Sequence, residues 1–223
     1  MALSGSARPP TAQAAVLAEL RTSILSGRLS PGTQILQNEL ATEFGVSRAP
    51  LRDALRSLEG QGLVRYSSHR GYYVTEIDVE EVAELGRVRQ VVETEALRRA
   101  TAGIDEETIA RMSVAMAQMD GAEAKSDWAA WLDAHRAFHF ALFEASRREL
   151  VVRVLSQLWD FADLYRSYYM RTRQSDSRDR REHESILAAA EARDVVRLVR
   201  LMDAHRGGTV ESIEASLTDG RRL

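Results

Sequence analysis

Apolar residues recur at helical spacing along most of this 223-residue chain, but the pattern is interrupted once in the first third. Three helices are expected there, over residues 14–25, 36–44 and 47–59. Ser47 is suited to cap the third, because its hydroxyl can accept a hydrogen bond from a first-turn amide. Residues 63–66 and 72–75 resemble short strands around a glycine-containing turn, which predicts a hairpin. Two helices joined at residues 45–47 and followed by a hairpin indicate a winged helix-turn-helix.

Beyond residue 77 the pattern is helical throughout. Six helices are expected, over residues 78–102, 105–123, 127–145, 149–172, 178–192 and 194–217. Aspartates suited to capping stand at four of the starts: Asp78, Asp105, Asp127 and Asp194. The fold class is therefore mainly α, an N-terminal winged helix-turn-helix followed by an all-α six-helix bundle. We assign residues 1–12 to a disordered tail, 13–77 to the winged helix and 78–219 to the helical domain.

Composition narrows the chemistry that the chain can perform. It contains no cysteine, which excludes disulfides, thiolate metal ligands and a cysteine nucleophile. No apolar run approaches the ~18 residues of a membrane span, and residues 1–10 lack the apolar core of a secretory signal. We therefore expect a cytoplasmic protein with no membrane partner.

Charge separates the two parts of the chain. Residues 1–76 carry 8 arginines against 6 acidic residues, whereas residues 77–223 carry 22 basic and 27 acidic residues. A mildly basic small part followed by an acidic larger part suits a DNA-binding module fused to a second domain.

Arginines follow one side of the third expected helix. Arg48, Arg52 and Arg56 recur every four residues, about 100° round the helix from an apolar stripe of leucines. Guanidinium groups in this position can neutralise phosphates or bind guanine edges in the major groove. A solvated helix face would show the same spacing, so the stripe alone does not decide between the two interpretations.

The residues of the first part closely resemble the GntR-type winged helix. The matching segments are Leu29-Ser-Pro-Gly-Thr, Glu39-Leu-Ala, Gly45-Val-Ser-Arg-Ala-Pro-Leu-Arg-Asp-Ala-Leu and Leu58-Glu-Gly-Gln-Gly-Leu-Val. The resemblance implies that Arg48 and Arg52 contact bases in a double-stranded operator, with Ser47 beside them. It also implies a wing contact at Arg70 and Gly71. Asn38 stands where some members carry a contacting arginine, and we include it in the same DNA-binding set.

Four of the five histidines fall in the expected bundle. His135 and His139 are four residues apart and share one helix face, while His183 and His205 lie on the last two helices within apolar periodicity. Imidazoles that three helices direct into a bundle core can form a metal site. The alternative is a set of hydrogen-bonded core histidines, and the spacing leaves both open.

The helical part is similar to the FCD effector domain of FadR-subfamily regulators. Phe138-His139-Phe-Ala-Leu, His183-Glu-Ser-Ile-Leu and His205 carry the resemblance. In that family an aspartate or asparagine and three histidines bind a divalent metal, and His139, His183 and His205 match the three histidines. His135 replaces the oxygen ligand, which favours zinc or nickel over harder ions.

The same resemblance assigns Arg89 to an effector carboxylate, which implies a small organic acid as the ligand. The alternative is structural, because Arg89 is four residues before Glu93 and can form an exposed helix ion pair with it. The two interpretations remain open.

The main hypothesis is a ligand-responsive repressor or activator that binds an inverted-repeat operator as a homodimer. A metalloenzyme that uses the histidines to activate water is a second hypothesis, although no motif supplies its general base. A third is a structural or metal-storage role for the helical domain.

Overall fold

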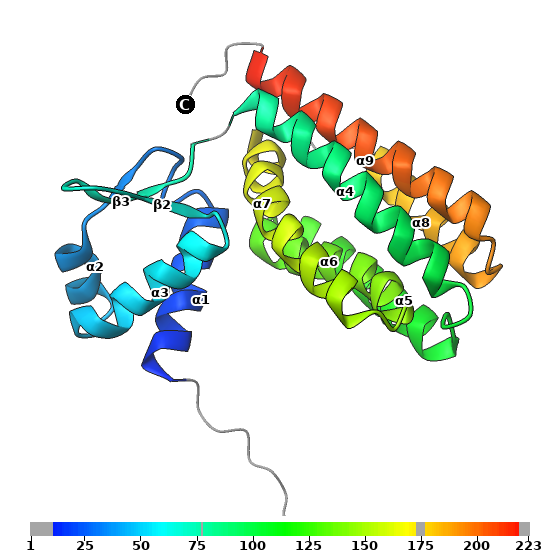
Figure 1. Cartoon of the computed structure of the whole chain (residues 1–223), viewed down its shortest axis with the longest axis horizontal. Coiled ribbons are helices and arrows are strands. Elements are labelled where there is room, and N and C mark those ends of the chain that lie inside the picture. Colours follow the sequence, from blue (N-terminus) through cyan, green and yellow to red (C-terminus); the bar gives the residue numbers. More distant parts are fainter. Residues whose placement is uncertain (1–10, 77, 173–176, 219–223) are drawn as a thin grey trace, which may run out of the picture. The chain divides into compact units, whose positions relative to one another are not determined.

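The computed structural model describes residues 11–76, 78–172 and 177–218 (Figure 1). It divides the chain into two compact units, Met1–Glu76 and Ile77–Leu223, one residue before the predicted boundary. Both units have the predicted fold class, a winged helix-turn-helix and an all-helical bundle.

The N-terminal unit places a three-helix core against a small sheet. Its elements are α1 Ala12–Leu25, β1 Gln34–Ile35, α2 Gln37–Glu43, α3 Arg48–Gly60, β2 Val64–Ser67 and β3 Gly71–Val74. Helices α1 and α2 pack on α3, whose Leu51, Leu55 and Leu58 are fully buried. The sheet order is β1-β3-β2, and both pairings are antiparallel. The apolar stripe of α3 thus lies in the core, so the opposite side of the helix faces solvent.

Three details of the N-terminal unit differ from the sequence predictions. The predicted tail extends too far, because Thr11 caps α1 by accepting a hydrogen bond from the Ala14 amide at 3.2 Å; residues 1–10 lie outside the described residues. Ser47 occupies the N-cap position of α3, but its side chain forms no capping hydrogen bond. Strand β1 was not predicted, since a run of only two residues carries no alternation.

In the part of the chain that the structure describes, the C-terminal unit contains six helices. They are α4 Val79–Ala100, α5 Glu106–Glu123, α6 Trp128–Ala145, α7 Glu149–Thr172, α8 Ser177–Glu191 and α9 Val195–Thr218. The aspartate caps form as predicted. Their carboxylates accept hydrogen bonds from the amides of Glu80, Thr108, Ala130 and Arg197 at 2.9–3.1 Å. Capping satisfies first-turn amides that have no partner within the helix.

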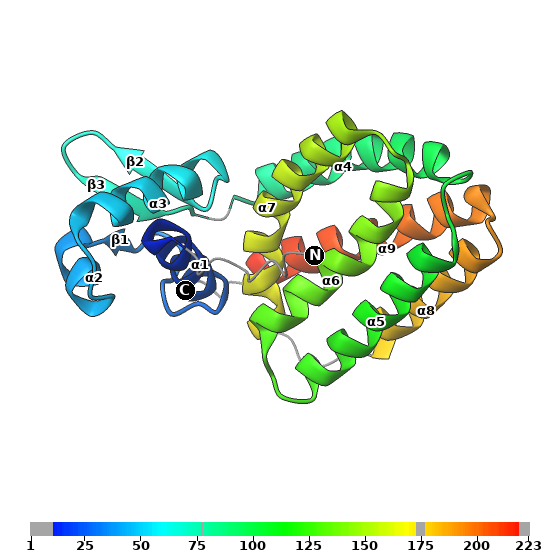
Figure 2. The same ribbon diagram turned by 90° about the horizontal axis from the view of Figure 1, so that it is seen from below.

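The bundle brings together helices that are distant in sequence. Helix α4 packs along α9 and also contacts α6 and α7, while α8 packs on α5 and α9 (Figures 1 and 2). Trp159 and Phe138 are among the largest fully buried side chains of the chain. Among the described residues, no helix combines the length and apolarity that crossing a membrane requires.

Candidate functional site

The outward side of α3 carries free guanidinium groups. Arg48 and Arg52 are exposed, and neither forms an ion pair with any described residue. Arg56 differs, because its guanidinium lies 3.9 Å from the Asp53 carboxylate. The first two turns of α3 therefore present two uncompensated positive charges to solvent, where a polyanion can reach them.

The wing is built by the hairpin and supported by β1. His69 and Gly71 adopt positive φ angles of 64° and 89°, and the Arg70 amide donates to the Ser67 carbonyl at 3.0 Å. The Gln34 side chain on β1 donates to the Arg70 carbonyl at 2.6 Å. This contact fixes the backbone of the turn while the Arg70 side chain remains exposed. Gln34 was not anticipated from the sequence, because the strand that carries it was missed.

The remaining members of the predicted DNA-binding set lie on the same unit. Asn38 is exposed in the first turn of α2, and Ser47 is exposed directly before α3. Gly71 is half-buried at the start of β3.

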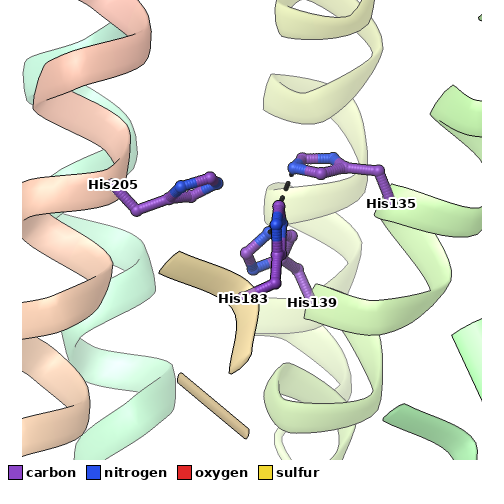
Figure 3. Close-up of side chains that lie close together, drawn as sticks. All are labelled: His135, His139, His183 and His205. Atoms are coloured by element: carbon purple, nitrogen blue, oxygen red, sulfur yellow. Dashed lines mark hydrogen bonds between the residues drawn. The ribbon is translucent and has the colours of Figure 1, made fainter. Parts of the chain in front are cut away.

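Inside the bundle, four histidines from three helices converge. His135 and His139 extend from α6, His183 from α8 and His205 from α9, and their imidazoles point toward a common centre (Figure 3). One nitrogen from each lies within 4.8 Å of the others, and no residue of the set is more than 6% exposed. His69 lies apart, exposed in the wing.

Hydrogen bonds at Nδ1 direct the Nε2 atoms of His183 and His205 inward. The Nδ1 atom of His183 donates to the Asp179 carbonyl at 2.7 Å, and that of His205 lies 2.7 Å from a Glu182 carboxylate oxygen. Because a backbone carbonyl only accepts, Nδ1 of His183 holds the proton and its Nε2 carries a lone pair. The Nε2 atom of His205 is buried and has no partner among the described residues.

Burial keeps His135, His139 and His183 neutral. Desolvation lowers the pKa of His135 and His139 well below 6.5, and the positive charge of Arg166 contributes in the same direction. Desolvation and the neighbouring His205 lower the pKa of His183 to about 3. Neutral imidazole is the form that coordinates a metal ion.

The donor set fits a divalent cation. The Nε2 atom of His139 lies 3.1 Å from that of His135 and 3.3 Å from that of His183. Those two separations match the roughly 3.3 Å edge of a tetrahedron with Zn–N distances of about 2.0–2.1 Å, whereas the four nitrogens together span up to 4.8 Å. A bound cation would also give a partner to the orphaned His205 nitrogen.

Arg89 is paired with Glu93, but the pair is buried rather than exposed. Its Nε atom donates to one carboxylate oxygen of Glu93 at 2.9 Å, and its Nη2 atom lies 2.8 Å from the same oxygen. The two side chains are 7% and 0% exposed. The guanidinium also covers the ring of Trp159, 4.4 Å from its centroid. Because Trp159 contacts His135 and His139 through its ring, Arg89 lies beside the histidine cluster.

Glu93 organises this region, a role that the sequence did not indicate. It also accepts hydrogen bonds from Trp159 Nε1 and from Arg206 Nε, each at 2.9 Å. Burial raises the pKa of Glu93, but Arg89 and Arg206 more than offset that effect, so the net pKa is lowered. The partners come from α4, α7 and α9, and only the Arg89–Glu93 spacing was visible in sequence.

Comparisons with known proteins identify both units. Residues 12–74 match the family model described as "Bacterial regulatory proteins, gntR family". Residues 84–207, more than half of the chain, match the FCD domain.

Similar proteins extend over nearly the whole chain. The HTH-type transcriptional regulator BphR of Paraburkholderia xenovorans is 28% identical over 197 residues, covering 86% of this chain and 80% of that protein. The HTH-type transcriptional repressor RspR of Escherichia coli is 26% identical, covering 87% and 85%. The fold resembles that of the solved E. coli McbR/YncC, with a TM-score of 0.81, 19% identity and coverage of 94% and 100%.

Proposed function

Because the chain belongs to the GntR family of bacterial regulatory proteins and carries an FCD domain, we propose that it is a metal-dependent, acid-responsive transcriptional regulator. The observation that carries the proposal is the presence, in one chain, of free arginines on α3 and a buried four-imidazole cluster beside Arg89. The family and its relatives are transcriptional regulators and not enzymes, so the metalloenzyme hypothesis is set aside.

The winged helix binds an inverted-repeat operator through α3. Arg48 and Arg52 contact base edges, since both are exposed and lack an internal counter-charge. Arg70 and Gly71 in the wing contact the backbone or an adjacent groove, and Ser47 and Asn38 contact phosphates at the ends of their helices. Two-fold operators are matched by two-fold proteins, so the regulator acts as a homodimer. Because it acts on a bacterial DNA operator, the regulator is a cytoplasmic protein.

The four histidines hold zinc or nickel. The structural role of the ion is to join α6, α8 and α9, and its chemical role is to attract an anionic ligand. His135 supplies a nitrogen where related domains have an oxygen ligand, which favours borderline ions over manganese or magnesium. His135→Asp should therefore move the preference of the site toward manganese.

Arg89 holds the carboxylate of a small organic acid next to the metal. Its position over Trp159, within the same buried region as the histidines, supports this role, although Glu93 already pairs with it. Pairing orients the guanidinium and leaves further N–H donors for a ligand. The structural and effector interpretations of Arg89 are therefore compatible.

The test is operator binding by zinc-loaded protein. An operator is first selected from random double-stranded DNA, and its affinity is then measured with and without each acid of a carboxylate panel. We expect at least one acid to change the affinity of the wild type but not that of Arg89→Ala, while Arg99→Ala, which removes an exposed ion pair on the same helix, responds normally. A protein that selects no DNA sequence, or that ignores every acid while holding zinc, would contradict the proposal.

A further inference from the structure

Arg166 on α7 is a buried cation with little internal compensation. Its side chain is 5% exposed, and its one hydrogen bond within the described residues runs from Nη1 to Asp163 at a long 3.3 Å. The same carboxylate also accepts from Arg136 at 3.1 Å. Glu93 and half-buried Asp179 attract Arg166 without accepting a hydrogen bond from it. A guanidinium carries five N–H donors, so most of its binding capacity is unused.

A second cation, Arg89, is close enough that its charge helps to lower the pKa of Arg166, after the larger effect of burial. The guanidinium carbons of Arg89 and Arg166 lie 4.4 and 5.2 Å from the centroid of the Trp159 ring. Two like charges on one aromatic ring repel each other strongly in a region with little water. The centroid of that ring is 5.4 Å from that of His135 and 5.1 Å from that of His139. The two guanidinium groups and the imidazoles therefore border one buried region.

The compensation of these charges is uneven. Arg206 pairs with Glu93 and also donates two hydrogen bonds to the Asp203 carboxylate, whereas Arg166 donates a single long one to Asp163. Imidazoles bind a metal as neutral ligands, so a divalent cation would add its full charge beside Arg89 and Arg166. A ligand with one carboxylate can neutralise the metal or the arginine pair, whereas a ligand with two carboxylates can neutralise both.

We propose that Arg166 and Arg89 form a two-guanidinium subsite for a second carboxylate, so that the effector is a dicarboxylate rather than a monocarboxylate. One carboxylate binds the metal and the other accepts hydrogen bonds from the arginine pair. This inference rests on the proposed metal-dependent acid sensing and names the class of acid.

The test compares acids of equal chain length on the zinc-loaded full-length protein. Calorimetry measures the Kd of succinate against butyrate and of glutarate against valerate. We expect at least one dicarboxylate to bind about 10-fold or more tightly than its partner, because charge-assisted hydrogen bonds to the second carboxylate add to the affinity. Arg166→Gln should abolish that preference without weakening the monocarboxylate.

Arg136→Gln is the matched control. Arg136 binds the same Asp163 carboxylate, but it covers Phe140 instead of Trp159, so its removal should preserve the preference. Zinc stoichiometry reports whether each variant is folded. If Arg166→Gln loses zinc, Arg166→Lys, which keeps the positive charge, replaces it. In Arg166→Lys the preference should fall without vanishing, because the ammonium cannot bind a carboxylate through two parallel hydrogen bonds.

Equal binding of each acid pair would overturn the subsite, as would a preference that survives in Arg166→Gln or is undiminished in Arg166→Lys. Either result would leave the acid-responsive regulator unaffected. Zinc-loaded wild-type protein that binds none of these acids and no other carboxylate would overturn the sensing function, and the subsite with it.

Discussion

The two units use arginine in opposite ways. On α3, Arg48 and Arg52 are exposed and unpaired among the described residues. In the bundle, Arg89 and Arg206 are buried and share one carboxylate, that of Glu93. The first arrangement costs little in the folded state, because water solvates each charge. The second is stable only while every buried charge keeps its partner.

In the proposed function, this difference determines how each unit selects its ligand. Exposed guanidinium groups bind a polyanion that arrives from solvent, so their contribution falls as salt screens the charges. Buried guanidinium groups act at low effective dielectric on a small anion, and there a single misplaced charge has a large effect. The following predictions set the two environments against each other.

The largest effect is expected from breaking the buried network. Glu93→Gln leaves Arg89 and Arg206 without their shared carboxylate and should lower the free energy of unfolding of the helical unit by about 3–5 kcal/mol. Glu95→Gln, which breaks the exposed Glu95–Arg99 pair on the same helix, should cost about 0–1 kcal/mol. Denaturation followed by tryptophan fluorescence measures this unit alone, since Trp128, Trp131 and Trp159 all belong to it. Similar losses in both variants would mean that burial makes no difference to these pairs.

Acidification should destabilise the metal-free helical unit. The pKa values of His135, His139 and His183 are lowered in the folded state. Below pH 6.5 the unfolded chain therefore binds more protons than the folded chain does. Stability should therefore fall as pH drops from 6.5, by about 1.4 kcal/mol per pH unit for each histidine that has become protonated only in the unfolded state. The lowered pKa of Glu93 extends the loss below pH 4.5. Denaturant titrations of metal-free protein between pH 7 and 5 measure the slope, and a flat profile would show that the histidines are solvated.

Smaller effects are expected at the exposed arginines. Arg48→Ala and Arg52→Ala should each weaken specific operator binding by about 1–3 kcal/mol through loss of base contacts, with stability unchanged. Arg56→Ala is the matched control on the same helix, because the Arg56 guanidinium forms an ion pair with the Asp53 carboxylate. Competition gel shifts measure all three affinities. If Arg56→Ala weakens operator binding as much as the other two variants, Arg48 and Arg52 do not make base contacts that Arg56 lacks.

Local signals in the sequence predicted most of the fold, and the family resemblance selected the four histidines that the structure brings together, whose role as metal ligands stays a prediction. The aspartate caps and apolar spacing located the bundle helices, and the pair His135–His139 follows from helix geometry alone. Strand β1 carried no signal because it spans two residues. The environment of Arg89 was misjudged, because Arg206 lies 113 residues from its partner Glu93 and Trp159 lies 66 residues from it. Long-range pairing of polar groups has no periodicity that a single sequence can show.

The order of residues around Arg166 gave no indication of its role. It follows Tyr165 on a helix whose pattern predicts only a buried face. Its position over the same ring as Arg89 depends on how α4 and α7 pack, which the structure supplies.

The central claim is that the imidazoles of His135, His139, His183 and His205 hold one divalent metal ion. It is tested most directly by elemental analysis of protein purified without a chelator or a histidine tag and then incubated with zinc, nickel and manganese. We expect about one equivalent of zinc or nickel per chain in the wild type and in His69→Ala, whose imidazole lies in the wing. We expect almost none in His139→Ala, because that variant loses the nitrogen that lies close to those of both His135 and His183. Wild-type protein without stoichiometric metal after all three incubations would contradict the account and reduce the four histidines to a polar pocket.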